Sequence, residues 1–129
     1  MALDPGDLPG EVLEFLVERH LGTLTTLRPD GSPHVVAVAF AFDPGARTVR
    51  VIASRGSRKV RNLAAGGRAV VCQVDGPRWL ALEGHAVVAA DPERVAVAEA
   101  AYAARFGAPR PNPERVAIEI TVDRVLGRG

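Results

Sequence analysis

The sequence predicts a mainly β protein of the α+β class, a split or nearly closed barrel of about six antiparallel strands with peripheral helices. Short apolar runs alternate with turn sequences rich in Pro, Asp and Gly, and only three segments have a helical period. Successive runs lie close enough in the chain to pair as hairpins, which favours an antiparallel sheet. A chain of 129 residues is expected to form a single domain.

The first half predicts a helix followed by a meander of strands. Residues 10–20 place apolar side chains at helical spacing, as in an amphipathic helix that covers a core. Residues 21–27 and 35–42 flank the turn sequence RPDGSP and therefore predict a hairpin. The sequence DPG at residues 43–45 predicts the next turn, and residues 47–53 the third strand.

The second half predicts two helices and three strands. The shorter helix, over residues 58–65, follows Ser57, a residue type that favours the N-cap. The longer helix opens at Asp91-Pro92-Glu93 and runs to about Phe106. A kink is expected at Glu83-Gly84, and residues 127–129 are expected to be loose. The strands are expected over residues 68–74, 79–89 and 116–122.

Composition excludes several classes of protein. A formal net charge of +1 gives no global field for nucleic acid, and the basic residues are not interleaved with aromatic ones. No apolar run approaches the ~18 residues of a membrane span. The N-terminus lacks the pattern of a secretory signal, so the expected compartment is the cytoplasm. The single cysteine, Cys72, excludes an internal disulfide and is expected to pack in a strand.

The motifs of common enzyme classes are missing. The chain has no GxGxxG after a strand, no Walker A sequence and no GxSxG. His20, His34 and His85 lack metal-type spacing and have no cysteine partners, so no metal site is expected. No set of catalytic side chains stands out. If the protein is an enzyme, we expect a bound cofactor to carry the reaction.

The most unusual segment is SRGSRKVRN at residues 54–62, which contains four cations, no acid and Lys59, the only lysine of the chain. Arg58, Lys59 and Arg61 fall in the first turn of the predicted helix, where the helix dipole disfavours cations. Two interpretations are open. The segment is either a solvated basic face paired with acids elsewhere, or a site for a phosphate or carboxylate.

Trp79, the only tryptophan, also has two interpretations. It is either a core residue or, because it begins a predicted strand beside Arg78, a rim residue that stacks on a planar ligand or a partner.

Four segments together resemble a known superfamily. They are RHLGTLTTLRPDGSPHVVAVAFAFD, GSRKVRNL, CQVDGPRWLALEG and PRPNPERVAIEITVDRVLG. They resemble the split β-barrel flavin and deazaflavin oxidoreductases, the superfamily of pyridoxamine phosphate oxidase with its FMN-binding fold. Within it the sequence is most similar to the branch that uses the deazaflavin coenzyme F420, and there to biliverdin reductases. The resemblance covers about residues 12 to 127.

The resemblance implies a homodimer with coenzyme F420 in a groove between the subunits. It implies hydride transfer from the reduced cofactor to a conjugated tetrapyrrole, at the C10 methine bridge of biliverdin, which gives bilirubin. It implies no catalytic side chain. Two alternatives remain open: an FMN-dependent oxidoreductase of the same fold, and a carrier that binds a deazaflavin or a tetrapyrrole without catalysis.

The resemblance also implies a set of binding residues. Lys59, Ser57 and Arg58 would hold the cofactor phosphate, and Ser54, Ala53 and Ile52 would line its sugar-like chain. The ring would lie along Thr25, Pro33, His34, Val35 and Val36, with Trp79 from the facing subunit. The carboxylates of the substrate would meet Arg78, Arg55 and Arg110.

Overall fold

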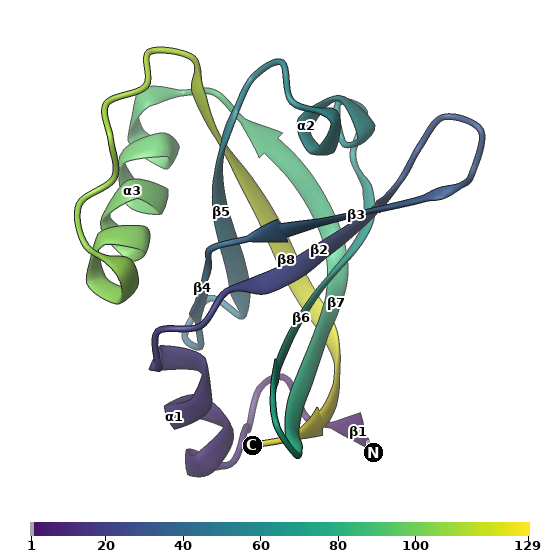
Figure 1. Ribbon diagram of the computed structural model, residues 1–129, viewed down its shortest axis with the longest axis vertical. Helices are drawn as coiled ribbons and strands as arrows, with labels where there is room; N and C mark the ends of the chain where they lie inside the picture. The colour runs from purple at the N-terminus through teal and green to yellow at the C-terminus, as the bar shows by residue number, and fades with distance from the viewer. Residues whose placement is uncertain (1) are drawn as a thin grey trace.

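In the computed structural model, which describes residues 2–129, eight strands form one curled antiparallel sheet with three helices around it (Figure 1). The predicted split β-barrel is therefore confirmed. In chain order the elements are β1 (Ala2–Leu3), α1 (Gly10–Val17), β2 (Gly22–Leu27), β3 (Pro33–Val38), β4 (Phe40–Asp43), β5 (Thr48–Ser54), α2 (Arg58–Asn62), β6 (Gly67–Asp75), β7 (Arg78–Ala89), α3 (Pro92–Phe106) and β8 (Arg115–Arg128).

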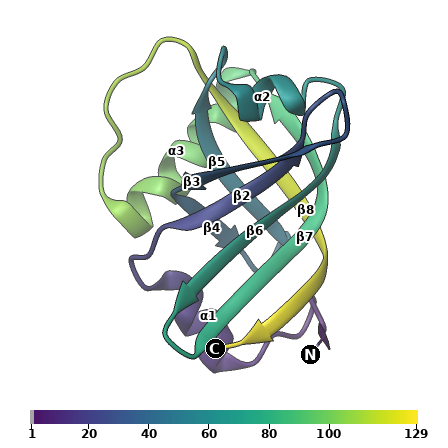
Figure 2. The same cartoon turned by 45° about the vertical axis from the view of Figure 1, so that its right-hand side comes forward.

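The strands run in the order β3-β2-β6-β7-β8-β5-β4, and β1 pairs with β8. Strand β8 joins the two parts of the sheet, because it pairs with β7 along one edge and with β5 along the other. Figure 2 shows β6, β7 and β8 running side by side. The barrel is split between β3 and the β4–β5 hairpin, which are the two ends of this order.

The strand expected over residues 35–42 is two strands with different partners. Strand β3 pairs with β2, as predicted for the first hairpin, whereas β4 pairs with β5. The chain changes partner at Ala39, so it crosses from one end of the sheet order to the other without a turn. The alternation of the sequence VVAVAFAF continues through this point, which is why the break has no local signal. With β1, this brings the number of strands to eight.

The last strand is longer than expected, and the prediction of a loose C-terminus is wrong. Strand β8 continues to Arg128, and Gly127 pairs with Leu80. A Cβ atom on Gly127 would lie 2.0 Å from the carbonyl oxygen of Trp79, so only glycine allows this close approach of the two strands.

Two other local predictions are confirmed. The Asp91 side chain caps α3 by accepting a hydrogen bond from the Arg94 backbone N–H at 3.1 Å. The register of β7 and β8 shifts between Glu83 and Gly84. A Cβ atom on Gly84 would lie 1.9 Å from the carbonyl oxygen of Thr121, so the bulge needs a glycine.

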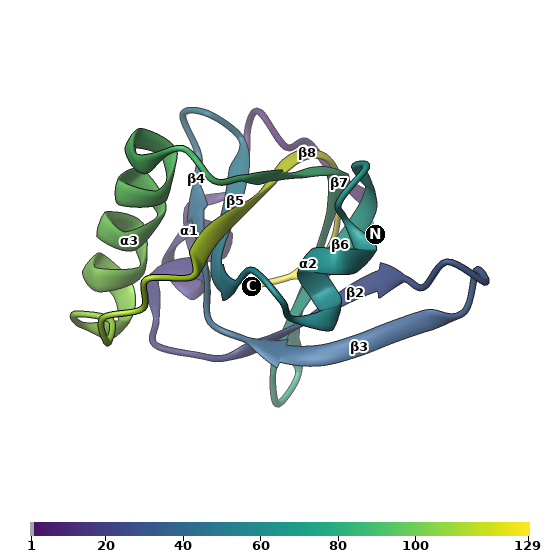
Figure 3. The same ribbon diagram turned by 90° about the horizontal axis from the view of Figure 1, so that it is seen from above.

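Large apolar side chains fill the interior of the barrel. The largest that are fully buried include Phe15, Phe40, Leu24, Leu63, Leu80, Leu82, Ile118 and Ile120. Helix α1 contributes Phe15 and so covers one end of the barrel, while α2 lies across the other end (Figures 1 and 3). Ligands therefore have to bind outside this core.

Candidate functional site

Two free strand edges border the split in the barrel. Among residues 2–129, strand β3 pairs only with β2, and β4 covers β5 only as far as Val51, which pairs with Phe40. Residues 52–54 of β5 thus pair with β8 alone. The two edges diverge from Ala39, where β3 leads into β4, and Figure 3 shows α2 at the open end. Their unpaired backbone groups are available to a ligand lying in the split.

Helix α2 is tied to the strands on both sides of the opening. The backbone N–H and the hydroxyl of Ser57 both donate to the Ser54 carbonyl, at 3.0 and 2.8 Å. On the other side, the Asn62 side-chain amide donates to the Thr26 hydroxyl at 3.0 Å. These contacts hold the segment 54–62 between β5 and β2.

Helix α2 is shorter than expected. Ser57 is its N-cap residue, as predicted, but the Ser57 side chain makes no capping hydrogen bond. The helix ends at Asn62, because residues 63–66 form a turn in which Gly66 donates its N–H to the Leu63 carbonyl at 2.9 Å with φ +79°. The Ser57 hydroxyl is bonded to Ser54 rather than to a helix N–H. With five residues in α2, the helix dipole contributes less here than the sequence suggested.

The cations of α2 have no acidic partner in the part of the chain that the structure describes. Arg58 and Lys59 are half-buried and Arg61 is exposed, and none of them forms an ion pair among residues 2–129. Arg58 donates to the neutral side-chain oxygen of Asn62 at 3.2 Å. Of the two interpretations of this segment, the structure therefore favours the anion site over the acid-paired surface.

His34 carries a buried atom without a partner. Within the described range 2–129 its Nδ1 has no hydrogen-bond partner, although the atom is buried. His34 pairs with Thr26 across β2 and β3, so both side chains lie on the same face of the sheet, and Thr26 is the residue that contacts α2. An unsatisfied polar atom of this kind is unusual and marks this face as a place where a ligand can bind.

The strands separate the side chains expected to contact the cofactor ring and its chain. Thr25 and Val35 pair with each other on the outer face of the sheet, whereas Val36 packs on the core. Ala53 lies in the core, while Ile52 points the other way and packs against the cluster of Ala89, Ala98 and Ala117. These side chains therefore form no single cluster. Apart from Thr25, which lies on β2, they belong to β3 and β5, the strands that border the split.

Arg55 and Arg110 lie near this end of the barrel. The Nε atom of Arg55 is 3.9 Å from a carboxylate oxygen of Glu114, and both side chains are largely exposed. The loop that carries Arg110 is joined to β5, because Asn112 donates its side-chain amide to the Ser54 hydroxyl at 2.9 Å. The Arg110 side chain is exposed.

Trp79 lies far from α2 within one chain. It is the second residue of β7 and pairs with Val74 next to the β6–β7 turn, which is at the other end of the molecule from α2 (Figure 1). Its side chain is 37% exposed and belongs to the outer face of the sheet, so it is a rim residue and not a core residue.

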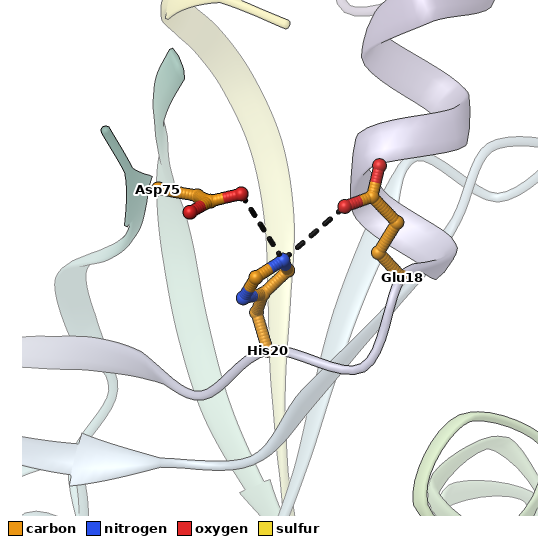
Figure 4. Close-up of side chains that lie close together, drawn as sticks. All are labelled: Glu18, His20 and Asp75. Atoms are coloured by element: carbon orange, nitrogen blue, oxygen red, sulfur yellow. Dashed lines mark hydrogen bonds and ion pairs between the residues drawn. The ribbon is translucent and has the colours of Figure 1, made fainter. Parts of the chain in front are cut away.

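Arg78, next to Trp79, is part of a charged cluster that the sequence did not predict. The guanidinium donates to Glu18 at 2.7 Å, contacts Asp75 and lies 4.3 Å above the centre of the Phe15 ring. Figure 4 shows the Nε2 atom of His20 between the two carboxylates, 3.2 Å from Glu18 and 3.6 Å from Asp75. The hydrogen bond from Arg78 is the main reason that the pKa of Glu18 falls to about 2. A role of Arg78 in substrate binding stays a prediction and would require these pairs to open.

Glu18, His20 and Asp75 also have the composition of a metal site, with ligand atoms within 4.8 Å of one another. Arg78 contacts both carboxylates, so its single positive charge offsets one of their two negative charges.

In the part of the chain that the structure describes, no helix is both long and apolar enough to cross a membrane.

Comparison with known proteins shows which family has this sequence and fold. The profile of the family described as pyridoxamine 5'-phosphate oxidase matches residues 8–129. The chain is 56% identical over 120 residues to the F420H(2)-dependent biliverdin reductase of Mycobacterium tuberculosis (strain CDC 1551 / Oshkosh), covering 93% of this chain and 88% of the relative.

Two solved structures are also similar. A structure named F420 reductase is 25% identical, with a TM-score of 0.74 over 92% of this chain and 98% of that one. A conserved hypothetical protein from Mycobacterium tuberculosis has a TM-score of 0.80 at 22% identity over 99% of this chain and 89% of that one, and this match bears on the fold alone. On the family profile and the 56% identity, the chain belongs to the pyridoxamine 5'-phosphate oxidase family.

Proposed function

We infer that the protein is an oxidoreductase that reduces biliverdin to bilirubin with a hydride from reduced coenzyme F420. The relative that is 56% identical carries this activity in its name, and a solved structure named F420 reductase has the same fold. The observation in this chain that carries the proposal is the pair of half-buried cations on α2, Arg58 and Lys59, which have no acidic partner among residues 2–129 and lie beside two free strand edges.

The residues present fit an elongated anionic cofactor. Lys59, Arg58 and Ser57 would bind its phosphate, and the free edge of β5 at residues 52–54 would bind the chain that follows. The ring would then lie along β3, on residues 33–36 with Thr25 beside them. The unpartnered Nδ1 of His34 on this stretch supports the placement, because a polar cofactor would supply the missing partner.

Coenzyme F420 supplies a hydride when it is bound in its reduced form, so the acceptor gains two electrons and takes one proton from solvent. The chain itself would hold the two reactants in contact and exclude water from between them. No side chain of this site would need to donate a proton. The described residues of this chain would act by binding and orientation.

A homodimer would complete the site. Val74, Val35 and Leu27 are 62%, 59% and 53% exposed, and the strand register places them on the same outer face of the sheet as Trp79. An apolar face of this kind is typical of a subunit interface. Pairing two such faces would bring Trp79 of the second subunit toward the cofactor, as expected from the sequence. We place this activity in the cytoplasm.

Arg55 and Arg110 remain candidates for contacts with carboxylates near the phosphate end. Arg55 directly follows β5 and its pair with Glu114 is long and exposed, while the loop that carries Arg110 is bonded to Ser54 through Asn112.

The proposal is tested by mixing the purified protein with reduced F420 and biliverdin. We expect the absorbance of oxidised F420 to recover as bilirubin forms in equal amount. If the purified protein shows a yellow flavin spectrum and turns over only with FMN, the cofactor is FMN and not F420. Tight binding of F420 without any turnover would instead support the carrier alternative.

A further inference from the structure

Two hollows flank the C-terminal end of α3, and neither is lined by a residue that we propose as a cofactor contact. The first has a volume of about 190 Å³ and lies between Leu16 and Val17 of α1, Phe42 of β4 and the alanines of α3, with Arg105 in its wall. The second has a volume of about 340 Å³. It is lined by Arg19, Leu21, Ala39, Tyr102 and Phe106. Together we call them the α3 groove.

Arg105 is a half-buried cation without an anion. Its guanidinium donates to three uncharged oxygen atoms: the carbonyls of Glu18 at 2.8 Å and Phe40 at 2.7 Å, and the side chain of Gln73 at 2.5 Å. Among residues 2–129 it forms no ion pair. A guanidinium has five N–H groups, so donors remain for a ligand in the first hollow. Burial lowers the pKa of Arg105 to about 10, which still leaves it charged at neutral pH.

The second hollow combines an aromatic wall with another cation. The rings of Tyr102 and Phe106 have their centroids 5.3 Å apart, and Leu21 opposite them is 64% exposed. Arg19 is exposed and forms no ion pair within the described residues. Apolar and aromatic walls with a few polar groups are typical of small-molecule sites.

The α3 groove reaches the cofactor edge. Ala39, in the wall of the second hollow, directly follows Val38, the last residue of β3. Strand β3 is the edge along which we place the cofactor ring. Val36, the nearest residue to which we assign the ring, is three residues from Ala39, so a flat ligand that extends from the groove along β3 would bring one part next to the ring, as hydride transfer requires.

We propose that the α3 groove binds the hydride acceptor, a planar conjugated molecule with two carboxylates, which meet Arg19 and Arg105 while its flat part lies against Tyr102 and Phe106. The proposal rests on the proposed function and names the acceptor site within it. The match is one of chemistry: two arginines without acids for two carboxylates, and an apolar aromatic surface for a conjugated chain. It assigns these carboxylates to arginines that the sequence did not single out.

The test uses the cofactor-free protein, so that it does not depend on turnover. Biliverdin is titrated into it while the quenching of Trp79 fluorescence and the circular dichroism induced in the pigment are followed. The two variants are Arg19→Gln, which removes an exposed charge without removing a core contact, and Tyr102→Leu. Since a charge-assisted bidentate contact is lost, we expect Arg19→Gln to raise the dissociation constant about tenfold. Arg47→Gln is the matched control, because Arg47 is exposed and lies outside the groove.

The dimethyl ester of biliverdin makes the test specific for charge. We expect wild type to bind the ester more weakly than biliverdin, and Arg19→Gln to bind the ester as well as wild type does, because the pair has been removed from both sides. Arg105→Lys keeps the charge at the first hollow but loses the planar set of guanidinium donors. Its affinity for biliverdin should lie between those of wild type and Arg19→Gln.

The proposal is overturned if Arg19→Gln and Tyr102→Leu bind biliverdin as wild type does, or if Arg47→Gln weakens binding equally. Affinity for F420, measured separately, should not change in any of these variants. If F420 does not bind wild type, the proposed function fails, while the pigment titration still decides the groove.

Discussion

The side-chain amide of Asn62 donates a hydrogen bond to the hydroxyl of Thr26 at 3.0 Å, and this contact ties α2 to β2. Thr26 is 1% exposed, so its hydroxyl has little access to water. In Asn62→Ala we expect a loss of about 1 kcal/mol in the free energy of unfolding, measured with urea. Affinity for F420 should fall as well, because α2 carries the proposed phosphate contacts. If affinity were unchanged, the position of α2 would not depend on this bond.

Lys59→Ala should weaken F420 binding by roughly tenfold or more while leaving the fold intact, because the half-buried ammonium forms no ion pair among residues 2–129 that its loss could disrupt. Titration of F420 fluorescence and urea unfolding measure the two effects. Arg61→Ala is the control, since residues two apart on a helix point in different directions and Arg61 is exposed. If both variants lost the same affinity for F420, Lys59 would contribute only through the overall positive charge of α2 and not through a specific contact.

Val74→Lys should convert the proposed dimer into a monomer, because it places a charge in the outer apolar face, where Val74 is 62% exposed and pairs with Trp79. Light scattering after size-exclusion chromatography measures the mass. Cofactor affinity should fall with the dimer, since Trp79 of the second subunit is then lost. Val97→Lys, at a 50% exposed position on α3, should leave the mass in solution and the cofactor affinity unchanged. A wild-type chain that is monomeric at all concentrations contradicts the proposed dimer.

The Glu18–Arg78 pair should make the free energy of unfolding depend on pH in the acidic range. The pKa of Glu18 is about 2 in the folded protein against an ordinary value of 4.5, mainly because Arg78 donates to it. A lowered pKa stabilises the fold above 4.5, and this contribution is lost as pH falls from 4.5 toward 2. Urea midpoints across this range should fall less steeply in Glu18→Gln than in wild type. Parallel curves would show that the pair does not contribute.

Gly84→Ala should destabilise the barrel strongly, by about 3 kcal/mol or more, since the new Cβ would lie 1.9 Å from the Thr121 carbonyl oxygen. The control is Gly10→Ala at the start of α1, where no atom lies within 4 Å of the added carbon. This change should be neutral or slightly stabilising. Denaturant unfolding measures both, and a Gly84→Ala protein as stable as wild type would mean that the bulge can move.

Local chemistry made several features of the fold predictable from the sequence. Asp91 followed by proline marks the start of α3, and the glycine after Glu83 marks the bulge in β7. The change of strand partner at Ala39 was not predictable in this way. Strands β3 and β4 both have the period of two that any strand has, and only the distant strands with which they pair distinguish them.

The same limit applies to the sites. The cations around Lys59 are contiguous in the sequence, so their lack of acids could be anticipated as one of two interpretations. The α3 groove takes Arg19, Ala39 and Arg105 from three distant segments, and the pairing of His20 with Asp75 joins the α1–β2 connection to the end of β6. Only the folded chain brings such groups together, because no spacing rule links them.

The central place of β8 has a consequence for biosynthesis. Every other strand precedes β8 in the chain, yet β8 alone connects β7 with β5. Until residues 115–128 are available, the strands that precede β8 can form at most two separate sheets with open edges, β3-β2-β6-β7 and β5-β4. The nascent chain is therefore most prone to aggregation before β8 has been synthesised. Chaperones that shield strand edges should matter most at that stage.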